Sequence, residues 1–342
     1  MQVASDASLR AFNTLSLEAR ATAMTRVADA DGLRTALAWA AERELPAIPL
    51  GEGSNVVFAG DVDALVIRQE SRGIDLLDEQ ADNVILRVAA GENWHGFVRW
   101  CLEQGYHGLE NLALIPGTVG AAPVQNVGAY GVELAAFVDR VHAVSVNDGA
   151  EVQLSAEECE FAYRHSVFKG RLRDHVVITA VDLRLSRQPV TETFYPSLAA
   201  YLQEAGIVSP WPREIFDAVV AIRSSRLPDP AREPNAGSFF KNPQLDASAA
   251  SDLQARFPGL PAYPQADSSV KLPAAWMIEH CGFKGARRGG VGVHHEHALV
   301  LVNHGDGTGE ELLQLASDIE KAVRETFGIG LVIEPRVYGR PV

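Results

Sequence analysis

The sequence has few of the features that mark several common classes of protein. Its 342 residues include only three cysteines, Cys101, Cys159 and Cys281, which are odd in number and widely spaced. That pattern excludes a disulfide framework and a thiolate zinc site, and it is typical of a reducing compartment. No apolar run approaches the roughly 20 residues of a membrane-spanning helix, and residues 1–10 do not resemble a secretory signal. We therefore expect a soluble, cytoplasmic protein.

Positive charge is also scarce. The chain has 44 acidic and 30 basic side chains, which gives a formal net charge of -14. A polyanionic surface repels nucleic acids and anionic lipids, so we expect neither as a partner. A site that concentrates local positive charge can still bind an anionic small molecule. We expect small-molecule substrates and a monomeric protein.

Aromatic residues make up only 7% of the chain, but hydrophobic residues make up 47%. This aliphatic supply excludes disorder and suffices for the cores of two or three domains. A weakly patterned connector, residues 186–211, contains three prolines and predicts a domain boundary near its end. We expect polar coil at the N-terminus, then strands at residues 23–28, 47–50, 56–58, 84–89, 141–146, 176–185, 298–302 and 331–338.

Helices are predicted where apolar residues recur with the helical period. One helix carries Leu33 and Leu37, with Asp31 as its expected N-cap. A second runs from Trp94 to Leu102, with Asn93 before it and Gly105 after it, and others are expected around residues 215–222 and 273–281. The last has Thr308 and Glu311 as a capping box and ends at Gly328.

The segment Gly51-Glu52-Gly53-Ser54-Asn55 joins one strand to the next. It lacks the third glycine and the following helix of the usual dinucleotide-binding fingerprint, which disfavours a Rossmann site. Two glycines with Ser and Asn can still form a nest of amides for a pyrophosphate. An ordinary tight turn is the alternative reading, and the segment alone does not separate the two.

A long stretch rich in small residues runs from Gly108 to Gly131. Small residues let the backbone approach a flat ligand, and repeated N–H groups can hold phosphate or ring oxygens. The alternative is a surface loop. Because a loop this long and this apolar should not lie exposed with nothing to cover, ligand binding is favoured.

Two further motifs favour simple structural roles when read alone. Ser238 lies between small residues and an apolar pair, and no Asp/His arrangement completes a hydrolase triad around it. A turn or cap role is therefore favoured. In His294-His295-Glu296-His297, neighbouring side chains of a strand would point to opposite faces, and the helical spacing of zinc proteases is absent. We expect no metal.

Five motifs, taken together and in order, resemble the family of UDP-N-acetylenolpyruvoylglucosamine reductases, flavoenzymes of peptidoglycan synthesis. They are Gly51-Glu52-Gly53-Ser54-Asn55, Ile115-Pro116-Gly117-Thr118-Val119-Gly120, Gly128-Ala129-Tyr130-Gly131, Tyr163-Arg164-His165-Ser166-Val167-Phe168-Lys169 and Asn235-Ala236-Gly237-Ser238-Phe239-Phe240-Lys241-Asn242-Pro243. The resemblance runs through nearly the whole chain.

The resemblance implies an α+β flavoprotein with two FAD-binding domains of the vanillyl-alcohol-oxidase-like type and a substrate-binding α+β domain. The expected bounds are 1–69 with the strand 330–342, then 70–213, then 214–329. It implies catalysis by Arg164, Ser238 and Glu334. The family commonly reads Glu-Pro-Glu-Val around that Glu, whereas this chain reads Val332-Ile333-Glu334-Pro335, so Glu334 follows from the spacing.

The resemblance also implies non-covalent FAD, with NADPH as the hydride donor and UDP-N-acetylglucosamine enolpyruvate as the substrate. The implied cofactor contacts are Gly51, Gly53, Ser54, Asn55, Ile115, Pro116, Gly117, Thr118, Gly120, Asn126, Gly128, Ala129 and Tyr130. The implied substrate contacts are Tyr195, Arg223, Arg226, Asn242, Tyr263 and Lys271.

Tyr195 matches the tyrosine that one subgroup folds over the nucleotide sugar, although Pro196 follows it where glycine is usual. Two rival functions remain open. The first is another oxidoreductase of this fold with covalently attached FAD, which commonly uses a His or Cys that residues 51–55 do not offer. The second is a non-catalytic protein that binds a nucleotide sugar.

Overall fold

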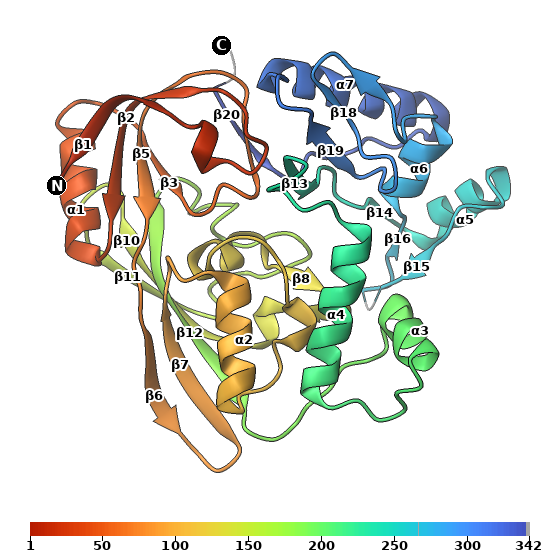
Figure 1. Ribbon diagram of the computed structural model, residues 1–342, viewed down its shortest axis with the longest axis horizontal. Coiled ribbons are helices and arrows are strands. Elements are labelled where there is room, and N and C mark those ends of the chain that lie inside the picture. The colour runs from red at the N-terminus through yellow and green to blue at the C-terminus, as the bar shows by residue number, and fades with distance from the viewer. Residues whose placement is uncertain (266, 340–342) are drawn as a thin grey trace. The chain divides into compact units, whose positions relative to one another are not determined.

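The computed structural model describes residues 1–265 and 267–339 of the chain (Figure 1). Helices and strands are mixed in an α+β arrangement, and the contacts divide the chain into two compact units. The first unit comprises residues 1–7, 21–52 and 63–225, and the second comprises 8–20, 53–62 and 226–342. The bounds of the three domains expected from the sequence remain a prediction.

A four-stranded sheet forms one part of the first unit. Its strand order is β1 (Val3–Ser8), β2 (Arg20–Val27), β5 (Val62–Gln69) and β3 (Ala47–Leu50), and β3 runs parallel to β5. Helix α1 (Ala30–Ala41) lies beside the sheet (Figure 1), and its Leu33 and Leu37 share a core with Leu65 and Ile67 of β5. Because β3 and β5 are parallel, the segments that follow them start at the same edge.

A five-stranded antiparallel sheet forms the other part of the first unit. Its order is β11 (Glu151–Ser155), β10 (Val138–Ser145), β12 (Val176–Ser186), β7 (Asn83–Ala89) and β6 (Ile74–Glu79). Alternate residues of β7, Val84, Leu86 and Val88, lie in the core, as the period of a strand requires. The remaining elements are α2 (Trp94–Gln104), η2 (Glu110–Leu112), η3 (Val119–Gln125), β8 (Gly128–Ala129), β9 (Val132–Glu133), η4 (Leu134–Ala136), α3 (Pro196–Glu204) and α4 (Pro212–Arg226).

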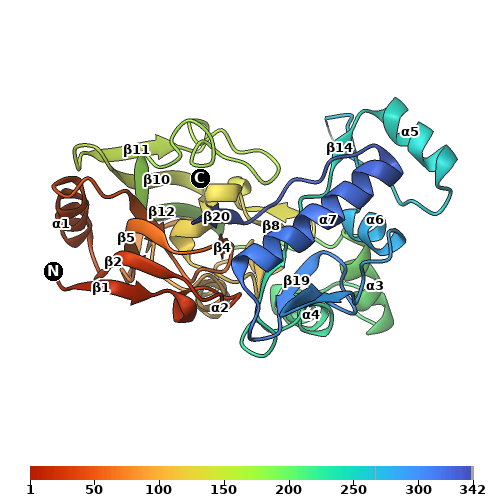
Figure 2. The same ribbon diagram turned by 90° about the horizontal axis from the view of Figure 1, so that it is seen from above.

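The second unit is built around a sheet of order β13 (Asn235–Ser238), β19 (Val300–Asn303), β18 (Val291–Val293) and β17 (Arg287–Arg288). Helix α7 (Gly309–Phe327) lies along it (Figure 2), and Leu312, Leu315 and Ile319 share a core with Val291 and Leu301. The other elements are η1 (Arg10–Phe12), the parallel pair β4 (Val56–Phe58) and β20 (Arg336–Tyr338), the small sheet β14 (Gln244–Leu245), β16 (Val270–Lys271) and β15 (Tyr263–Pro264), and helices α5 (Ala247–Arg256) and α6 (Ala274–His280).

Several local predictions are confirmed. Asn93 caps α2 by accepting a hydrogen bond from the Gly96 N–H, and Gly105 ends that helix at a φ of 76°. Thr308 and Glu311 form the capping box of α7. The segment after β3 leads into β4 without a helix, as expected.

Other local predictions are wrong. The N-cap of α1 is Asp29 and not Asp31, because the helix begins at Ala30 and the Asp29 carboxylate accepts from the Gly32 N–H. The N-terminus forms β1 where coil was expected, and helix α5 was not foreseen. Of the expected strand 331–338, only β20 is a strand.

The connector 186–211 also contains a helix that its weak pattern did not predict. Pro196 occupies the first position of α3, where a missing N–H costs nothing. Leu198 and Leu202 of this helix are buried in the core of the first unit. Across the described residues, we find no helix whose length and apolar character would let it span a membrane.

Candidate functional site

The Gly51–Asn55 loop begins at the edge where β3 and β5 end. Leu50 pairs with Arg68, so Gly51 and Gln69 follow at the same level of the sheet. A Cβ on Gly51 would lie 2.7 Å from Thr118 Oγ1, which shows how closely the two loops approach. Gly53 has a φ of 68°, and a Cβ there would lie 2.0 Å from the Phe12 carbonyl oxygen. Glycine is thus required at position 53 by the chain itself.

Glu52 links this loop to the second glycine loop of the first unit. One carboxylate oxygen accepts from Asn93 Nδ2 at 2.6 Å, and the other accepts from the Gly117 N–H at 2.9 Å. Glu52 is a candidate functional residue that the sequence reading did not single out. In the sequence, only its position between Gly51 and Gly53 of a possible phosphate-binding loop indicated a role for Glu52.

The Ile115–Gly120 loop differs from the nest of amides that the sequence suggested. Besides Gly117, the N–H groups of Val119 and Gly120 donate within the protein, to the carbonyl oxygens of Glu92 and Ala90. Three amides of this loop are therefore already used, and the Gly51–Asn55 loop is the better candidate for a pyrophosphate. Ile115 is half-buried, Pro116 is exposed, and Gly117 and Thr118 are buried.

A buried acceptor lies at the same edge of the four-stranded sheet. Gln69, at the end of β5, is 8% exposed, and its Nε2 donates to the Ile178 carbonyl oxygen at 3.3 Å. Its Oε1 is buried, and none of the described residues supplies a donor to it. Because an unsatisfied buried acceptor is costly, a ligand donor would stabilise this position. The glycine loops and Gln69 thus fit a bound nucleotide cofactor.

Asn126 is held within the protein by three side-chain hydrogen bonds. It is fully buried, its Nδ2 donates to Glu133 Oε2 at 2.7 Å and to the Ala162 carbonyl oxygen at 3.3 Å, and its Oδ1 accepts from the Ala135 N–H. All its polar atoms are therefore satisfied within the protein. These bonds hold Asn126 to the β8–β9 hairpin and its surroundings, and the cofactor contact expected for Asn126 stays a prediction.

That hairpin consists of β8 and β9, with Tyr130 and Gly131 at its turn. Both turn residues have positive φ, 48° and 86°, which suits the tight turn of a hairpin. Arg164, itself at a φ of 52°, donates from its Nη2 to the Gly128 carbonyl oxygen at 2.9 Å. The rings of Tyr130 and Tyr195 meet edge to face with centroids 5.4 Å apart.

Arg223 of α4 adds a second cation to this group. Its Nε donates to the Leu114 carbonyl oxygen at 3.2 Å. Burial and the charge of Arg164 lower the pKa of the Arg223 guanidinium, whereas Tyr130 raises it. Arg223 stays charged at neutral pH, as arginines do. The first unit thus brings together Arg164, Tyr130, Tyr195 and Arg223, a group suited to an anionic ligand.

Ser238 and Glu334 come together in the second unit. Ser238 ends β13 and pairs with Val300 of β19. The Glu334 N–H donates to the carbonyl oxygen of Phe239, the residue after Ser238, at 2.9 Å. The backbone at Glu334 therefore lies beside the Ser238 segment. Glu334 is only 9% exposed. The spacing that predicted Glu334 therefore leads to a buried carboxylate adjacent to the serine segment.

Three of the expected substrate contacts also gather in the second unit. Lys271 of β16 pairs with Tyr263 on one side and Gln244 on the other. Asn242 lies just before β14, and its Oδ1 accepts from the Ala274 N–H at 3.0 Å.

Arg226 is exposed, and its charge is among the influences that lower the pKa of His297, after burial and His294. Ser54 and Asn55 are half-buried, and the Asn55 carbonyl oxygen accepts from the Arg336 N–H.

The motif His294-His295-Glu296-His297 does not lie in a strand, whereas the prediction from the sequence was that its side chains alternate as in a strand. Strand β18 ends at Val293, and the rings of His294 and His295 lie only 4.5 Å apart. With Glu233 they form a group whose ligand atoms lie within 4.8 Å of one another.

The hydrogen bonds of His294 nevertheless argue against metal coordination. Its Nδ1 accepts from the N–H groups of Glu296 and His297, so the neutral ring carries its proton on Nε2, 3.4 Å from Glu233 Oε2. A metal would need the lone pair of that nitrogen, and the arrangement instead fits a close contact between the His294 ring and the Glu233 carboxylate.

Comparisons with known proteins agree with this geometry. Residues 21–155 match a family model described as an FAD binding domain, and residues 229–338 match the C-terminal domain of UDP-N-acetylenolpyruvoylglucosamine reductase. The chain is 48% identical to the UDP-N-acetylenolpyruvoylglucosamine reductase of Chromobacterium violaceum, over 98% of this chain and 99% of that protein. It is 47% identical to that of Pseudomonas aeruginosa, over 97% of each chain.

A solved structure supports the fold. The UDP-N-acetylenolpyruvylglucosamine reductase of Thermus caldophilus superposes with a TM-score of 0.67 over 98% of both chains, at 24% identity. This likeness confirms the α+β fold, the family model at residues 21–155 shows the FAD-binding part, and the identities over nearly the whole length establish the family. The chain belongs to the family of UDP-N-acetylenolpyruvoylglucosamine reductases.

Proposed function

We propose that the chain catalyses the NADPH-dependent reduction of UDP-N-acetylglucosamine enolpyruvate to UDP-N-acetylmuramate with non-covalent FAD, as a cytosolic step of peptidoglycan precursor synthesis. The observation that carries the proposal is the 48% identity to a named reductase over 98% of this chain. The FAD binding domain matched at residues 21–155 supports the cofactor.

The residues around the Gly51–Asn55 loop fit FAD. The Gly51–Asn55 loop would hold the pyrophosphate on its amides, and Gln69 Oε1 would accept a hydrogen bond from the cofactor. Bound FAD supplies the chemistry of accepting and donating hydride. The loop offers no histidine or cysteine for a covalent link, which favours non-covalent binding over the covalent rival.

The substrate's carboxylate is the expected partner of Arg164. Hydride addition to the terminal carbon of the enol ether sends negative charge into that carboxylate, and a forked guanidinium stabilises it more strongly as the charge grows. Ser238 would protonate the neighbouring carbon. Because a hydroxyl is a weak acid at neutral pH, the position of the serine must contribute much of its effect.

Glu334 and the cations have supporting roles in this proposal. Glu334 beside the same carboxylate is useful only if it shares or holds a proton, since two carboxylates repel each other. Arg223, Arg226 and Lys271 would offset the charge of the UDP phosphates on an otherwise acidic protein, and Tyr195, Asn242 and Tyr263 would add hydrogen bonds.

The visible spectrum of the purified protein tests the proposal in three steps. Oxidised flavin absorbance should be present, should bleach with NADPH, and should return on anaerobic addition of UDP-N-acetylglucosamine enolpyruvate. Arg164→Lys should retain the bleaching and slow the return by about 10²-fold, because the fork is lost. Bleaching without return would refute this reaction, and colour retained in an acid precipitate would favour covalent FAD.

A further inference from the structure

The side-chain amide of Asn111 joins two segments of the first unit that are far apart in the sequence. Asn111 lies in η2 and is 2% exposed. Its Nδ2 donates to the carbonyl oxygens of Tyr130 and Glu192, each at 2.9 Å. Both N–H bonds of the amide are therefore used. One partner is the turn of the β8–β9 hairpin, and the other lies shortly before Tyr195.

The turn that carries Asn111 is itself firmly held. The buried carboxylate of Glu110 accepts from the Gly108 N–H at 2.7 Å, and Trp94 Nε1 donates to the Leu112 carbonyl oxygen at 2.9 Å. Leu112 and Trp94 lie in the core of the first unit. Asn111 thus projects its amide from a rigid support.

The segment that Asn111 holds, residues 189–194, lies between two anchored stretches of the chain. Before it, Ser186 and His107 exchange backbone hydrogen bonds, and after it α3 buries Leu198 and Leu202. Between these anchors, Phe194 is 89% and Tyr195 43% exposed, so their burial contributes little. The bond from Asn111 to the Glu192 carbonyl therefore ties residues 189–194 to η2, whereas the Tyr195 carbonyl accepts from the N–H groups of Leu198 and Ala199 at the start of α3.

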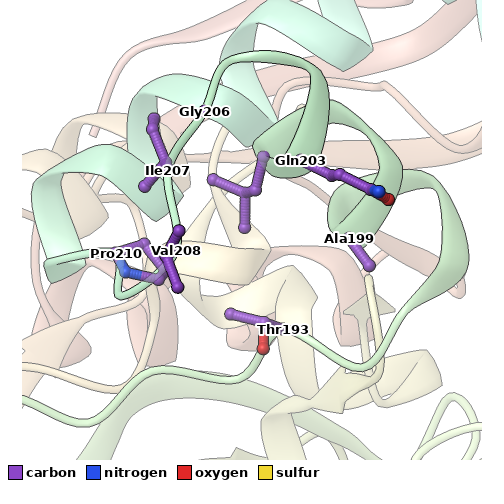
Figure 3. Close-up of a pocket in the computed structure, with 8 residues that line it drawn as sticks. Thr193, Ala199, Gln203, Gly206, Ile207, Val208 and Pro210 are labelled. Carbon is purple, nitrogen blue, oxygen red and sulfur yellow. The ribbon is translucent and has the colours of Figure 1, made fainter.

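The surroundings of the segment give it room to move. A cavity of about 310 Å³ borders it (Figure 3), and its lining residues are Thr193, Ala199, Leu202, Gln203, Gly206, Ile207, Val208 and Pro210. A segment with exposed side chains next to open space populates alternative conformations easily once an anchor is lost.

We propose that Asn111 is a positioning residue that sets Tyr195 against Tyr130. A single amide bonded to both segments fixes their register, and the 5.4 Å contact between the two rings follows from it. A Cβ on Gly131 would also lie within 4.0 Å of Glu192 Cγ and Tyr195 Cβ, which shows how closely the segments approach. The consequence for catalysis rests on the proposed function, in which Tyr195 contacts the substrate.

Asn111→Ala should raise the KM for the enolpyruvate substrate by about 3–10-fold, the effect of a lost hydrogen bond or two. Bleaching by NADPH should stay within about twofold of wild type, because the β8–β9 pairing and the Arg164 bond still hold the Tyr130 turn, and Tyr195 is proposed to contact only the substrate. Asn111→Ser keeps one donor, so its KM for the enolpyruvate substrate should lie between those of wild type and Asn111→Ala. Asn303→Ala is the matched control, because Asn303 is 1% exposed and also donates to a distant carbonyl, that of Leu15. It should lower stability without a selective effect on KM.

A double-mutant cycle tests whether Asn111 acts through Tyr195. Tyr195→Phe should raise the substrate KM in the wild-type background and add little in the Asn111→Ala background, because the ring is already misplaced. Full additivity would overturn the proposal. So would equal damage to both half-reactions by Asn111→Ala.

Limited proteolysis gives a test that needs no activity. Chymotrypsin should cleave after Phe194 several-fold faster in Asn111→Ala than in wild type or Asn303→Ala, whereas the Tyr195–Pro196 bond resists cleavage. Unchanged cleavage after Phe194, located by mass spectrometry, would overturn the proposal. This measurement also separates the two proposals. If wild type fails to reduce the substrate, the proposed function is wrong, and the cleavage rates still decide whether Asn111 anchors the segment.

Discussion

At the residue scale, Gly53 is required by the backbone of the protein itself rather than by a ligand. Gly53 faces the Phe12 backbone, so any side chain there collides with the protein before a ligand is considered. A Gly53→Val variant would lose flavin for reasons of folding and could not test phosphate binding. Glu52 provides a cleaner test, because its side chain links two loops and its backbone does not require glycine.

Glu52→Ala should lower FAD affinity by about tenfold or more, because hydrogen bonds to a charged group contribute about 1.5–3 kcal/mol. The Gly51–Asn55 and Ile115–Gly120 loops would lose their shared anchor. Flavin content after dialysis, and titration of the apoprotein with FAD followed by fluorescence, measure the effect. Asp63→Ala, which removes an exposed carboxylate bonded to Thr22, is the control. Unchanged flavin affinity in Glu52→Ala would contradict the assignment of these loops to the cofactor.

Ser238 separates the two half-reactions. Ser238→Ala should still bleach with NADPH at a near-normal rate, because hydride transfer from NADPH involves no proton donation to carbon. The return of flavin absorbance with the enolpyruvate substrate should slow by about 10²–10⁴-fold, the usual effect of losing a general acid. Ser238→Cys should recover part of this loss. Stopped-flow traces report each half separately, and a wild-type rate of return in the alanine variant would leave Ser238 a structural residue.

At the element scale, the five-stranded sheet contains a charged group that spans three of its strands. Arg87 of β7 donates from two nitrogens to the carboxylate of Asp182 on β12, both at 2.8 Å, and His142 Nε2 of β10 lies 2.8 Å from the same carboxylate. Burial raises the pKa of Asp182, but the bonds from Arg87 and His142 lower it more, and the net pKa is depressed.

This arrangement predicts a pH-dependent contribution to stability. A depressed folded-state pKa stabilises the protein above the unfolded value of about 3.9, and this stability is lost as the pH falls through the folded value. Asp182→Asn should therefore cost about 1.5–3 kcal/mol at pH 7, and the difference from wild type should shrink in acid. Urea unfolding at a series of pH values measures it, with the exposed Asp78→Asn as control. A difference that does not change with pH would contradict this account.

At the scale of the whole molecule, cofactor binding and stability should be linked. A ligand that binds only the folded state at 100 times its dissociation constant adds about 2.7 kcal/mol to the free energy of unfolding. The melting temperature of the apoprotein should thus rise with added FAD, and less with FMN, which lacks the pyrophosphate proposed for the Gly51–Asn55 loop. Equal shifts with FAD and FMN would place the pyrophosphate elsewhere.

The sequence by itself determined the features that depend on local pattern. Helix α2 could be read from its apolar period, its Asn93 cap and its terminal Gly105, and α7 from its capping box. The order of five short motifs indicated the family, which the comparisons confirm. Arg164 and Ser238 followed from those motifs and Glu334 from the spacing near the C-terminus, and their roles stay proposals.

Only the tertiary structure decided which distant residues meet. The sequence cannot show that Asn111 bonds Tyr130 and Glu192, that Glu52 joins two loops, or that the amides of Gly117 and Gly120 are already used. Nor could it place a helix after Tyr195, because α3 depends on burying Leu198 and Leu202 in a core built by other segments. Local pattern sets backbone preference and amphipathic faces, whereas hydrogen-bond satisfaction and close approach depend on partners that the fold brings together.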